Sequence, residues 1–347
     1  MAARQTYKVI QWATGNVGSR ALKKVIEHPD CELVGLWVSS QAKEGRDAGA
    51  LCGLPDTGIR ATRDAAALIA TPADVVLYMR QGTDFDELCA ILASGKNVVT
   101  TRGDFHHPRT MDAAVRARIE AACAKGNSSI YSTGSSPGFI TEALAIPLLS
   151  LAREHACVTI DEYADMTSRD SPDMIFNIMG FGVPMGEFDQ RKVEYVKHDF
   201  AASLGQLADA IGLPCEEFVA KGEMAAARND KQIAAGLIAK GTVGAMRITI
   251  EGLHKGKPVL RFRANWYCTD DIAEDWGLRA SGWKVRTEGD TPVEVNITFP
   301  VSEEDYPRFT PGLTAHRPIN AIPMVVAAPP GIRTTVDMAQ VIPVFGG

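Results

Sequence analysis

The stretch Val9-Ile10-Gln11-Trp12-Ala13-Thr14-Gly15-Asn16-Val17-Gly18-Ser19 decides the fold. An apolar, β-branched run leads into a turn of small residues, and the turn leads into a helical pattern. The small residues follow the motif A-x-G-x-x-G, with Ala13, Gly15 and Gly18 in its three defined positions. A strand, such a turn and a helix in succession are typical of dinucleotide-binding domains. The stretch therefore predicts a nucleotide-binding turn.

The glycines of this turn have separate physical tasks. Gly15 lets the main chain approach a pyrophosphate, and Gly18 lets the helix pack closely on the strand. The N–H groups at the helix start face the phosphates, and the helix dipole adds to the attraction. A tight turn without a ligand is the alternative, but the flanking strand, helix and second strand favour a binding site. We predict that a dinucleotide contacts Thr14, Gly15, Asn16, Val17 and Gly18.

Outward from this turn, short apolar runs alternate with helical patterns. Such alternation predicts βαβ units and a parallel sheet, whose loops gather at one edge and bind ligands there. The predicted fold class is therefore α/β, with a Rossmann-type doubly wound parallel sheet. The expected strands are residues 7–13, 33–38, 75–78, 97–100 and 129–131, and the expected helices are residues 16–27, 85–94 and 110–125.

The pattern changes after about residue 155, where the strand-like runs become longer. The turn His254-Lys255-Gly256-Lys257 joins two of them as a hairpin. Long strands joined by hairpins predict a second, mostly antiparallel α+β domain. The expected strands are residues 158–165, 243–253, 258–268 and 291–299, with helices at 199–211 and 314–328. We predict a Rossmann domain at residues 1–140, a substrate and dimerisation domain at 141–312 and a C-terminal segment at 313–347.

Composition excludes several functional classes. The net charge of −6 and the absence of a basic stretch exclude nucleic acid as the expected partner. The longest apolar runs are too short to span a bilayer, and no apolar leader precedes the first strand. The seven cysteines are scattered without a C-x-x-C pair, which argues against a disulfide framework or a zinc site. We expect a cytoplasmic protein without a metal.

The end of the second strand favours NADP over NAD. An acidic residue there would bind the ribose 2′-hydroxyl of NAD. This chain has Ser39 and Ser40 instead, followed by Lys43 and Arg46. Hydroxyls and cations suit the anionic oxygens of a 2′-phosphate. The alternative is that the two cations are solvated surface charges, with Glu44 between them, so NAD remains possible.

Four motifs resemble the dihydrodipicolinate reductase-like family, and within it the branch of 2,4-diaminopentanoate dehydrogenases and native amine dehydrogenases. They are QWATGNVG at residues 11–18, NVVTTRGDFHHP at 97–108, STGSSPGF at 132–139 and TAHRPINAIPMVVAAPPGI at 314–332. The resemblance implies a Rossmann domain, an α+β domain and a C-terminal segment that returns to the first. It also implies a homodimer, a nicotinamide cofactor and reductive amination of a small carbonyl compound or its reverse.

Two stretches depart from the family pattern. Residues 161–167 lack the histidine pair and lysine of true dihydrodipicolinate reductases, which argues against that reaction. Where the amine dehydrogenases resemble one another in a glutamate, this chain reads Arg102-Gly103-Asp104. The departure leaves open a reductase of an imine or carbonyl group that uses no ammonia. A regulator that binds the dinucleotide without turnover is a third possibility, because fold does not dictate function.

The loops after the predicted strands supply the candidate active-site residues. Asp104 and His106 are the catalytic candidates, because a carboxylate and an imidazole suit proton transfer near neutral pH. A polar loop that caps the next helix is the alternative, and for each of His106 and His107 alone it is the preferred one. Further cofactor contacts are expected at Arg80, Gln81, Thr101, Arg102 and Ser135. Substrate contacts are expected at Ser136, Asp165, Arg169, Met174, Phe176 and His316.

Overall fold

The computed structural model describes residues 5–302 and 305–343, which form two compact units. The first unit contains residues 1–139 and 310–347, and the second contains residues 140–309. The first unit therefore includes the C-terminal part of the chain as well as the Rossmann segment.

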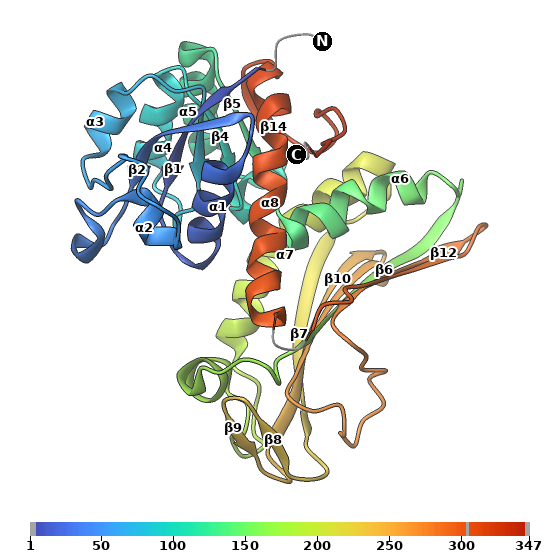
Figure 1. The fold of residues 1–347 in the computed structure, drawn as a ribbon. Helices are drawn as coiled ribbons and strands as arrows, with labels where there is room; N and C mark the ends of the chain where they lie inside the picture. The colour runs from blue at the N-terminus through green and yellow to red at the C-terminus, as the bar shows by residue number, and fades with distance from the viewer. Residues whose placement is uncertain (1–4, 303–304, 344–347) are drawn as a thin grey trace. The chain divides into compact units, whose positions relative to one another are not determined.

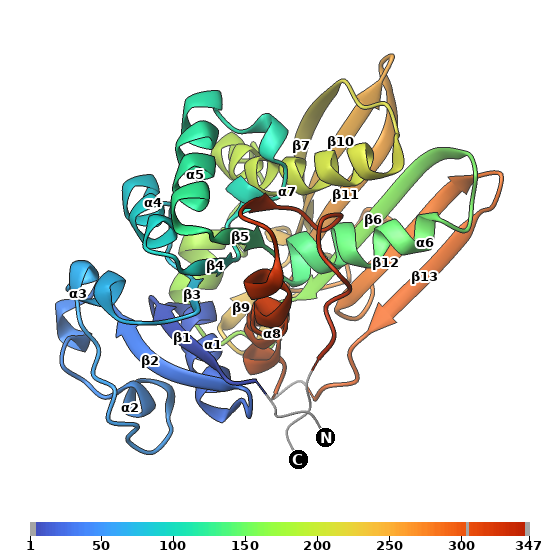
Figure 2. The ribbon, with the colours of Figure 1, turned by 90° about the horizontal axis from the view of Figure 1, so that it is seen from above.

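The first unit is built around a six-stranded sheet in which every neighbouring pair is parallel. Figures 1 and 2 show this sheet between two layers of helices. The chain runs outward from β1 to β2, then returns to β3 on the other side of β1 and continues to the opposite edge. In spatial order the strands are β14 (Gly331–Arg333), β5 (Ser129–Ser132), β4 (Asn97–Thr100), β3 (Val75–Tyr78), β1 (Tyr7–Trp12) and β2 (Cys31–Trp37).

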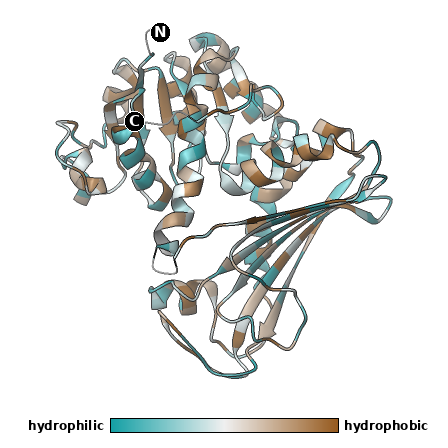
Figure 3. Cartoon of the chain, turned by 45° about the vertical axis from the view of Figure 1, so that its right-hand side comes forward, coloured by the Kyte–Doolittle hydropathy of each residue, from teal (hydrophilic) through white to brown (hydrophobic). Residues whose placement is uncertain are grey.

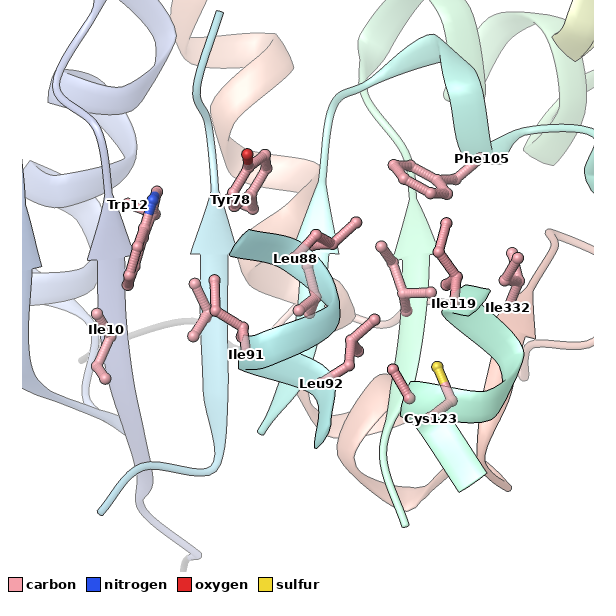
Figure 4. Packing of buried hydrophobic residues seen from close by; sticks show 14 of the residues in the cluster. Ile10, Trp12, Tyr78, Leu88, Ile91, Leu92, Phe105, Ile119, Cys123 and Ile332 are labelled. Carbon is pink, nitrogen blue, oxygen red and sulfur yellow. The ribbon is translucent and has the colours of Figure 1, made fainter. Parts of the chain in front are cut away.

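Both faces of this sheet are buried because successive strand residues point to opposite faces. Val9 packs against α1 (Asn16–Glu27) and α8 (Tyr306–Ala327), whereas its neighbour Ile10 belongs to the core on the other face. Figure 4 shows that second core, where Leu88, Ile119 and others lie over the strands. In Figure 3 the strands are mostly brown, as expected for a sheet without a solvated face. The helices on that side are α3 (Ala65–Ala70), α4 (Phe85–Ala93) and α5 (Ala113–Gly126).

The C-terminal part of the chain completes the first unit. Ile319 and Ile322 of α8 are buried against the sheet, and the hydroxyl of Ser129 donates to the carbonyl of Val325 at 2.7 Å. β14 then pairs with β5 as the outermost strand. Segments that are remote in sequence therefore share one core.

The chain also contains shorter helical elements. They are η1 (Gln41–Lys43), α2 (Ala48–Cys52), η2 (Gly103–Phe105), η3 (Pro108–Thr110) and η4 (Ser135–Ala143).

The second unit contains another six-stranded sheet, in which only β6 and β11 pair in parallel. In spatial order its strands are β13 (Val293–Thr298), β12 (Gly282–Gly289), β6 (His155–Asp165), β11 (Lys257–Tyr267), β10 (Val243–His254) and β7 (Glu217–Ala226). A separate ribbon joins β8 (Lys231–Ile233) to β9 (Gly236–Ile238), and the helices are α6 (Ala145–Leu149), η5 (Asp173–Met179) and α7 (Gln190–Ile211).

The two faces of this sheet differ in chemistry. On one face, Phe262 stacks on Phe200 of α7 with ring centroids 4.0 Å apart. The other face carries ion pairs between neighbouring strands, such as Arg261 with Glu251 at 2.7 Å. A half-buried antiparallel sheet has this alternation of apolar and polar residues.

The predicted fold class is confirmed: a doubly wound parallel sheet is followed by a mostly antiparallel second sheet. The predicted hairpin is present as well, because His254 pairs with Lys257 and the two residues between them have positive φ, 50° at Lys255 and 72° at Gly256. That geometry is typical of a two-residue primed turn.

The buried position of α8 predicts a strong effect of truncating one of its core residues. Ile322 is fully buried, so Ile322→Ala should lower the free energy of unfolding of the first unit by about 2–5 kcal/mol. Ile342→Ala is the matched control, because this isoleucine is 61% exposed. Urea unfolding followed by circular dichroism measures both, and equal losses would contradict the packing described.

Candidate functional site

The loops after five parallel strands meet at the carboxyl edge of the first sheet. The chain reverses its direction of travel across the sheet between β1 and β3. Ligands of doubly wound folds bind outside the carboxyl ends of the strands at such a switch point. The loop after β1 and the start of α1 lie at this point, so the predicted nucleotide-binding turn occupies the expected place.

The N-terminus of α1 has the chemistry of an anion site. Gly15 is its N-cap, no described side chain caps it, and its first turn contains no acidic residue. By contrast, Asp84 caps α4 and Asp112 caps α5 by accepting bonds from main-chain N–H groups. The N–H groups at the start of α1 therefore have no side-chain acceptor. A bound phosphate would provide one.

The two glycines of the motif differ in the space around them. A Cβ built on Gly18 would lie 2.3 Å from the carbonyl oxygen of Ala13, so this close approach of helix and turn requires glycine. A Cβ on Gly15 would meet nothing within 4 Å, which leaves open space in front of the turn. Ala13 itself has a φ of +74°, a conformation in which glycine is the usual residue. The turn thus keeps the fingerprint geometry although its first position is alanine.

Lys43 joins the loop after β2 to this turn. Its ammonium group donates to the carbonyl oxygen of Thr14 at 2.8 Å and lies 3.1 Å from the hydroxyl of Thr14. Ser39 and Ser40, at the end of β2, are exposed beside it. The predicted cofactor residues of the two loops are therefore brought together, with a positive charge next to the glycine turn.

Arg80 is held in a cluster that the sequence did not predict. Its guanidinium lies over the ring of Trp37 at 5.4 Å, and Nη1 donates to Oε1 of Glu87 at 2.9 Å. The same oxygen accepts bonds from Nε1 of Trp12 at 3.0 Å and from the hydroxyl of Tyr78 at 3.1 Å. Burial raises the pKa of Tyr78 to about 12, so its hydroxyl stays a donor at neutral pH.

These contacts fix the orientation of Arg80 before any ligand binds. Arg80 and Gln81 also line an open cavity of about 450 Å³ beside the loop after β3. Trp37 and Glu87 are the positions that sequence reasoning missed. The available signal was a tryptophan at the end of each of β1 and β2.

Asp104 lies between the loops after β3 and β4. One oxygen of its carboxylate accepts a bond from the hydroxyl of Thr83 at 2.7 Å and lies 3.5 Å from Nε of Arg102. Nε of Arg102 also donates to the hydroxyl of Thr83 at 3.2 Å. Asp104 and Arg102 therefore form an ion pair, with side chains only 19% and 22% exposed. This ion pair holds the carboxylate in place between the two loops.

His106 lies in an enclosed environment. The residue is 2% exposed, and its Nε2 lies 3.4 Å from the hydroxyl of Ser132. That hydroxyl donates to the carbonyl oxygen of Arg102 at 2.6 Å. His106 is therefore enclosed beside the ends of β4 and β5, and its predicted role in proton transfer stays a prediction.

The loop after β5 carries Ser135 and Ser136, and the loop after β4 carries Thr101. The hydroxyl of Ser135 lies 2.8 Å from that of Thr314 on α8, and the hydroxyl of Thr101 contacts the sulfur of Met79 at 3.7 Å. The hydroxyl of Ser136 has no partner among the described residues. A polar atom of this kind is costly to leave unsatisfied, so Ser136 is suited to bind a ligand.

His316 lies on α8 in the first unit and keeps part of its surface exposed. Desolvation of the rest of the ring, and then the charge of Lys24, lower its pKa. The ring is therefore neutral near pH 7. None of this tests whether His316 contacts a substrate, so that role stays a prediction.

The remaining predicted substrate residues belong to the second unit. Asp165 ends β6 and lines a cavity of about 870 Å³ within that unit. Arg169 and Met174 are partly buried and do not line this cavity. Phe176 belongs to the core, since its ring would meet a Cβ on Gly182 at 3.1 Å and one on Gly236 at 3.2 Å. Its role as a substrate contact stays a prediction.

Among residues 5–302 and 305–343, no group of three metal-ligating side chains could hold a metal ion. Within the same part of the chain, no helix is long and apolar enough to cross a membrane.

The open space at Gly15 predicts separable effects on binding and folding. Gly15→Ala should leave the thermal unfolding temperature nearly unchanged, because the added methyl group meets no protein atom. It should weaken dinucleotide binding at least about tenfold, because the methyl group stands where the main chain approaches the pyrophosphate. Fluorescence titration with NADPH measures the affinity. Gly186→Ala, also in open space but in the second unit, is the control, and equal NADPH affinity in both variants would contradict the assignment of the site.

Known proteins that resemble this chain are dehydrogenases and reductases. Residues 9–127 match the family model described as dihydrodipicolinate reductase, N-terminus. The chain is 26% identical over 342 residues to an amine dehydrogenase from Streptomyces virginiae, covering 95% of each chain. Among solved structures, it resembles the amine dehydrogenase from Mycobacterium smegmatis, with a TM-score of 0.75, 19% identity and 97% of each chain covered.

A more distant structure has the same fold. The chain resembles a biliverdin reductase from Synechocystis, solved in complex with biliverdin and NADP+, with a TM-score of 0.51 and 12% identity over 95% and 94% of the two chains. The predicted family resemblance is confirmed: residues 9–127 match the model of the N-terminal part of dihydrodipicolinate reductases. The whole chain resembles amine dehydrogenases, as expected of an NAD(P)-dependent oxidoreductase.

Proposed function

We propose that this protein is an NADP-dependent oxidoreductase that reduces a C=N or C=O bond of a small molecule, with reductive amination of an aldehyde or ketone and its reverse as the favoured reaction. The observation that carries the proposal is the uncapped start of α1 at Gly15, at the switch point of a doubly wound sheet. Similarity to an amine dehydrogenase over 95% of the chain supports the favoured reaction.

The residues at the edge of the first sheet fit a nicotinamide dinucleotide. The N–H groups at residues 16–18 would hold the pyrophosphate, and the open space at Gly15 would admit it. Lys43, with Ser39 and Ser40 beside it, would bind a 2′-phosphate, which is why we propose NADP rather than NAD. When bound, the cofactor supplies the hydride.

The protein's own part in the reaction would be to orient the substrate and to stabilise the charge on its reacting nitrogen. The unpartnered hydroxyl of Ser136 would bind a polar group of the cofactor or substrate. Asp104, held in place by Arg102, would stabilise a positively charged amine or iminium nitrogen through the charge of its carboxylate. His106 and Ser132 would hold the loops that carry these groups.

One observation favours a second candidate reaction. Asp104 already accepts a bond from Thr83 and pairs with Arg102, so less of its charge is available to an ammonium group than an unpaired carboxylate would offer. This arrangement is compatible with a reductase of an existing imine or carbonyl group that never binds ammonia. The two reactions differ in their requirement for ammonium.

We also propose a cytoplasmic homodimer. The polar face of the second sheet carries ion pairs between its strands, such as Lys284 with Glu294 at 2.8 Å, and is suited to pack on a second copy of itself. The seven cysteines are free thiols, as is typical of proteins from a reducing compartment.

The first test of the reaction is oxidation of NADPH by a panel of aldehydes and ketones with and without ammonium. Reductive amination predicts a rate that depends on ammonium concentration and an amine product detected by mass spectrometry. The same assay with NADH measures the proposed preference for NADP. Equal rates with and without ammonium would exclude amination and leave the second candidate reaction.

A second test concerns Asp104. Asp104→Asn removes the negative charge but keeps the size, so we expect turnover to fall by about 10²-fold or more, in the range of a lost charge-stabilising or proton-transferring group, with little change in the affinity for NADPH. Steady-state kinetics and fluorescence titration separate the two quantities. Asp64→Asn is the control, because Asp64 caps the distant helix α3. Unchanged turnover in Asp104→Asn would remove this carboxylate from the mechanism.

A further inference from the structure

Gln11 is a fully buried glutamine in β1, two residues before the nucleotide-binding turn begins at Ala13. Because successive strand residues point to opposite faces, its side chain lies on the same face of the sheet as that of Val9. Val9 packs there among apolar residues of α1 and α8. A polar amide is costly to bury in such surroundings unless its atoms find hydrogen-bond partners. Packing alone therefore does not explain a glutamine at this position.

The two ends of the Gln11 amide differ in their partners. Its Nε2 donates to the carbonyl oxygen of Ala13 at 2.9 Å. Its Oε1 is buried and has no partner among the described residues. A methionine of similar length would fill the same space without a buried, unsatisfied amide oxygen. The feature that distinguishes glutamine from methionine here is the bond from Nε2 to the turn.

Ala13, which accepts this bond, has an unfavourable backbone conformation. Its φ of +74° lies in the left-handed region, where the Cβ of an alanine crowds the main chain. Its N–H group donates to the carbonyl oxygen of Trp37 at 2.9 Å. Its carbonyl oxygen lies against Gly18, where a Cβ would be only 2.3 Å away. The amide of Gln11 thus holds the same carbonyl oxygen that makes the close contact between the turn and α1.

We propose that Gln11 is a positioning residue, whose amide keeps Ala13 in the left-handed conformation that aligns the start of α1 for a dinucleotide. The N–H groups at residues 16–18 follow this turn directly, so a change of φ at Ala13 would change their direction. When only a fraction of the molecules has the competent conformation, the apparent affinity falls by that fraction. Glycine is the usual residue at positive φ, and Gln11 compensates for alanine there. This assignment rests on the dinucleotide site of the proposed function.

The test is a double-mutant cycle of Gln11→Met and Ala13→Gly, followed by fluorescence titration with NADPH. Gln11→Met should weaken NADPH binding about tenfold, because the left-handed alanine then lacks its support. In a chain that already carries Ala13→Gly, the same substitution should weaken binding less than about twofold, because glycine adopts this conformation without support. The affinities of the four proteins therefore identify Ala13 as the residue through which Gln11 acts.

The matched control is Gln206→Met, because Gln206 is also a buried glutamine, 5% exposed, but belongs to the second unit. Its affinity for NADPH should equal that of the unsubstituted protein. Thermal unfolding separates positioning from folding. Gln11→Met removes the unsatisfied Oε1 together with the bond from Nε2, so we expect its unfolding temperature to change by less than about 4 °C.

Unchanged NADPH affinity in Gln11→Met would overturn the proposal. A tenfold loss that persists in the presence of Ala13→Gly would also overturn it, because Gln11 would then act through another residue. If the unsubstituted protein bound neither NADPH nor NADH, the proposed function would fail instead. Hydrogen exchange of peptides that span residues 13–19 would then still test the positioning, because it needs no ligand. Exchange should be faster in Gln11→Met than in Gln206→Met, and equal rates would contradict the role of Gln11.

Discussion

The contact on which the first unit depends is the close approach of α1 to the turn that precedes it. A Cβ at Gly18 would lie 2.3 Å from the carbonyl oxygen of Ala13, so only glycine permits this geometry. The contact directs the N-terminus of α1 to the carboxyl edge of the sheet, beside the loops after β2 and β3. Without it, the main-chain N–H groups at residues 16–18 would not face the place where the chain reverses across the sheet.

Around this contact, side chains that follow different strands stabilise one another before any ligand binds. Lys43 bonds to the glycine turn, Arg80 is fixed by Glu87 and Trp37, and Asp104 pairs with Arg102. Such preorganisation reduces the entropy that a bound ligand must overcome. Several predicted contact residues therefore have protein partners that hold their side chains in place.

The second unit shows a different use of polar residues. Its sheet buries one face under α7 and keeps charged side chains on the other, where they pair between strands. At the ends of β6 and β11, carboxylates lack such pairing and border a cavity instead.

Local sequence determined the elements of the Rossmann segment. The helix at Asn16–Glu27 and the strands at Val75–Tyr78 and Asn97–Thr100 have the predicted bounds, because apolar period and small-residue turns are local signals. Tertiary structure alone decided the environments of single side chains. The enclosure of His106, the packing of Phe176 between two glycines and the convergence of Trp12, Tyr78 and Arg80 on Glu87 all depend on residues distant in sequence. A pattern of residue types predicts which side of a strand or helix is buried, but the partner that each polar atom meets is set by how the elements pack.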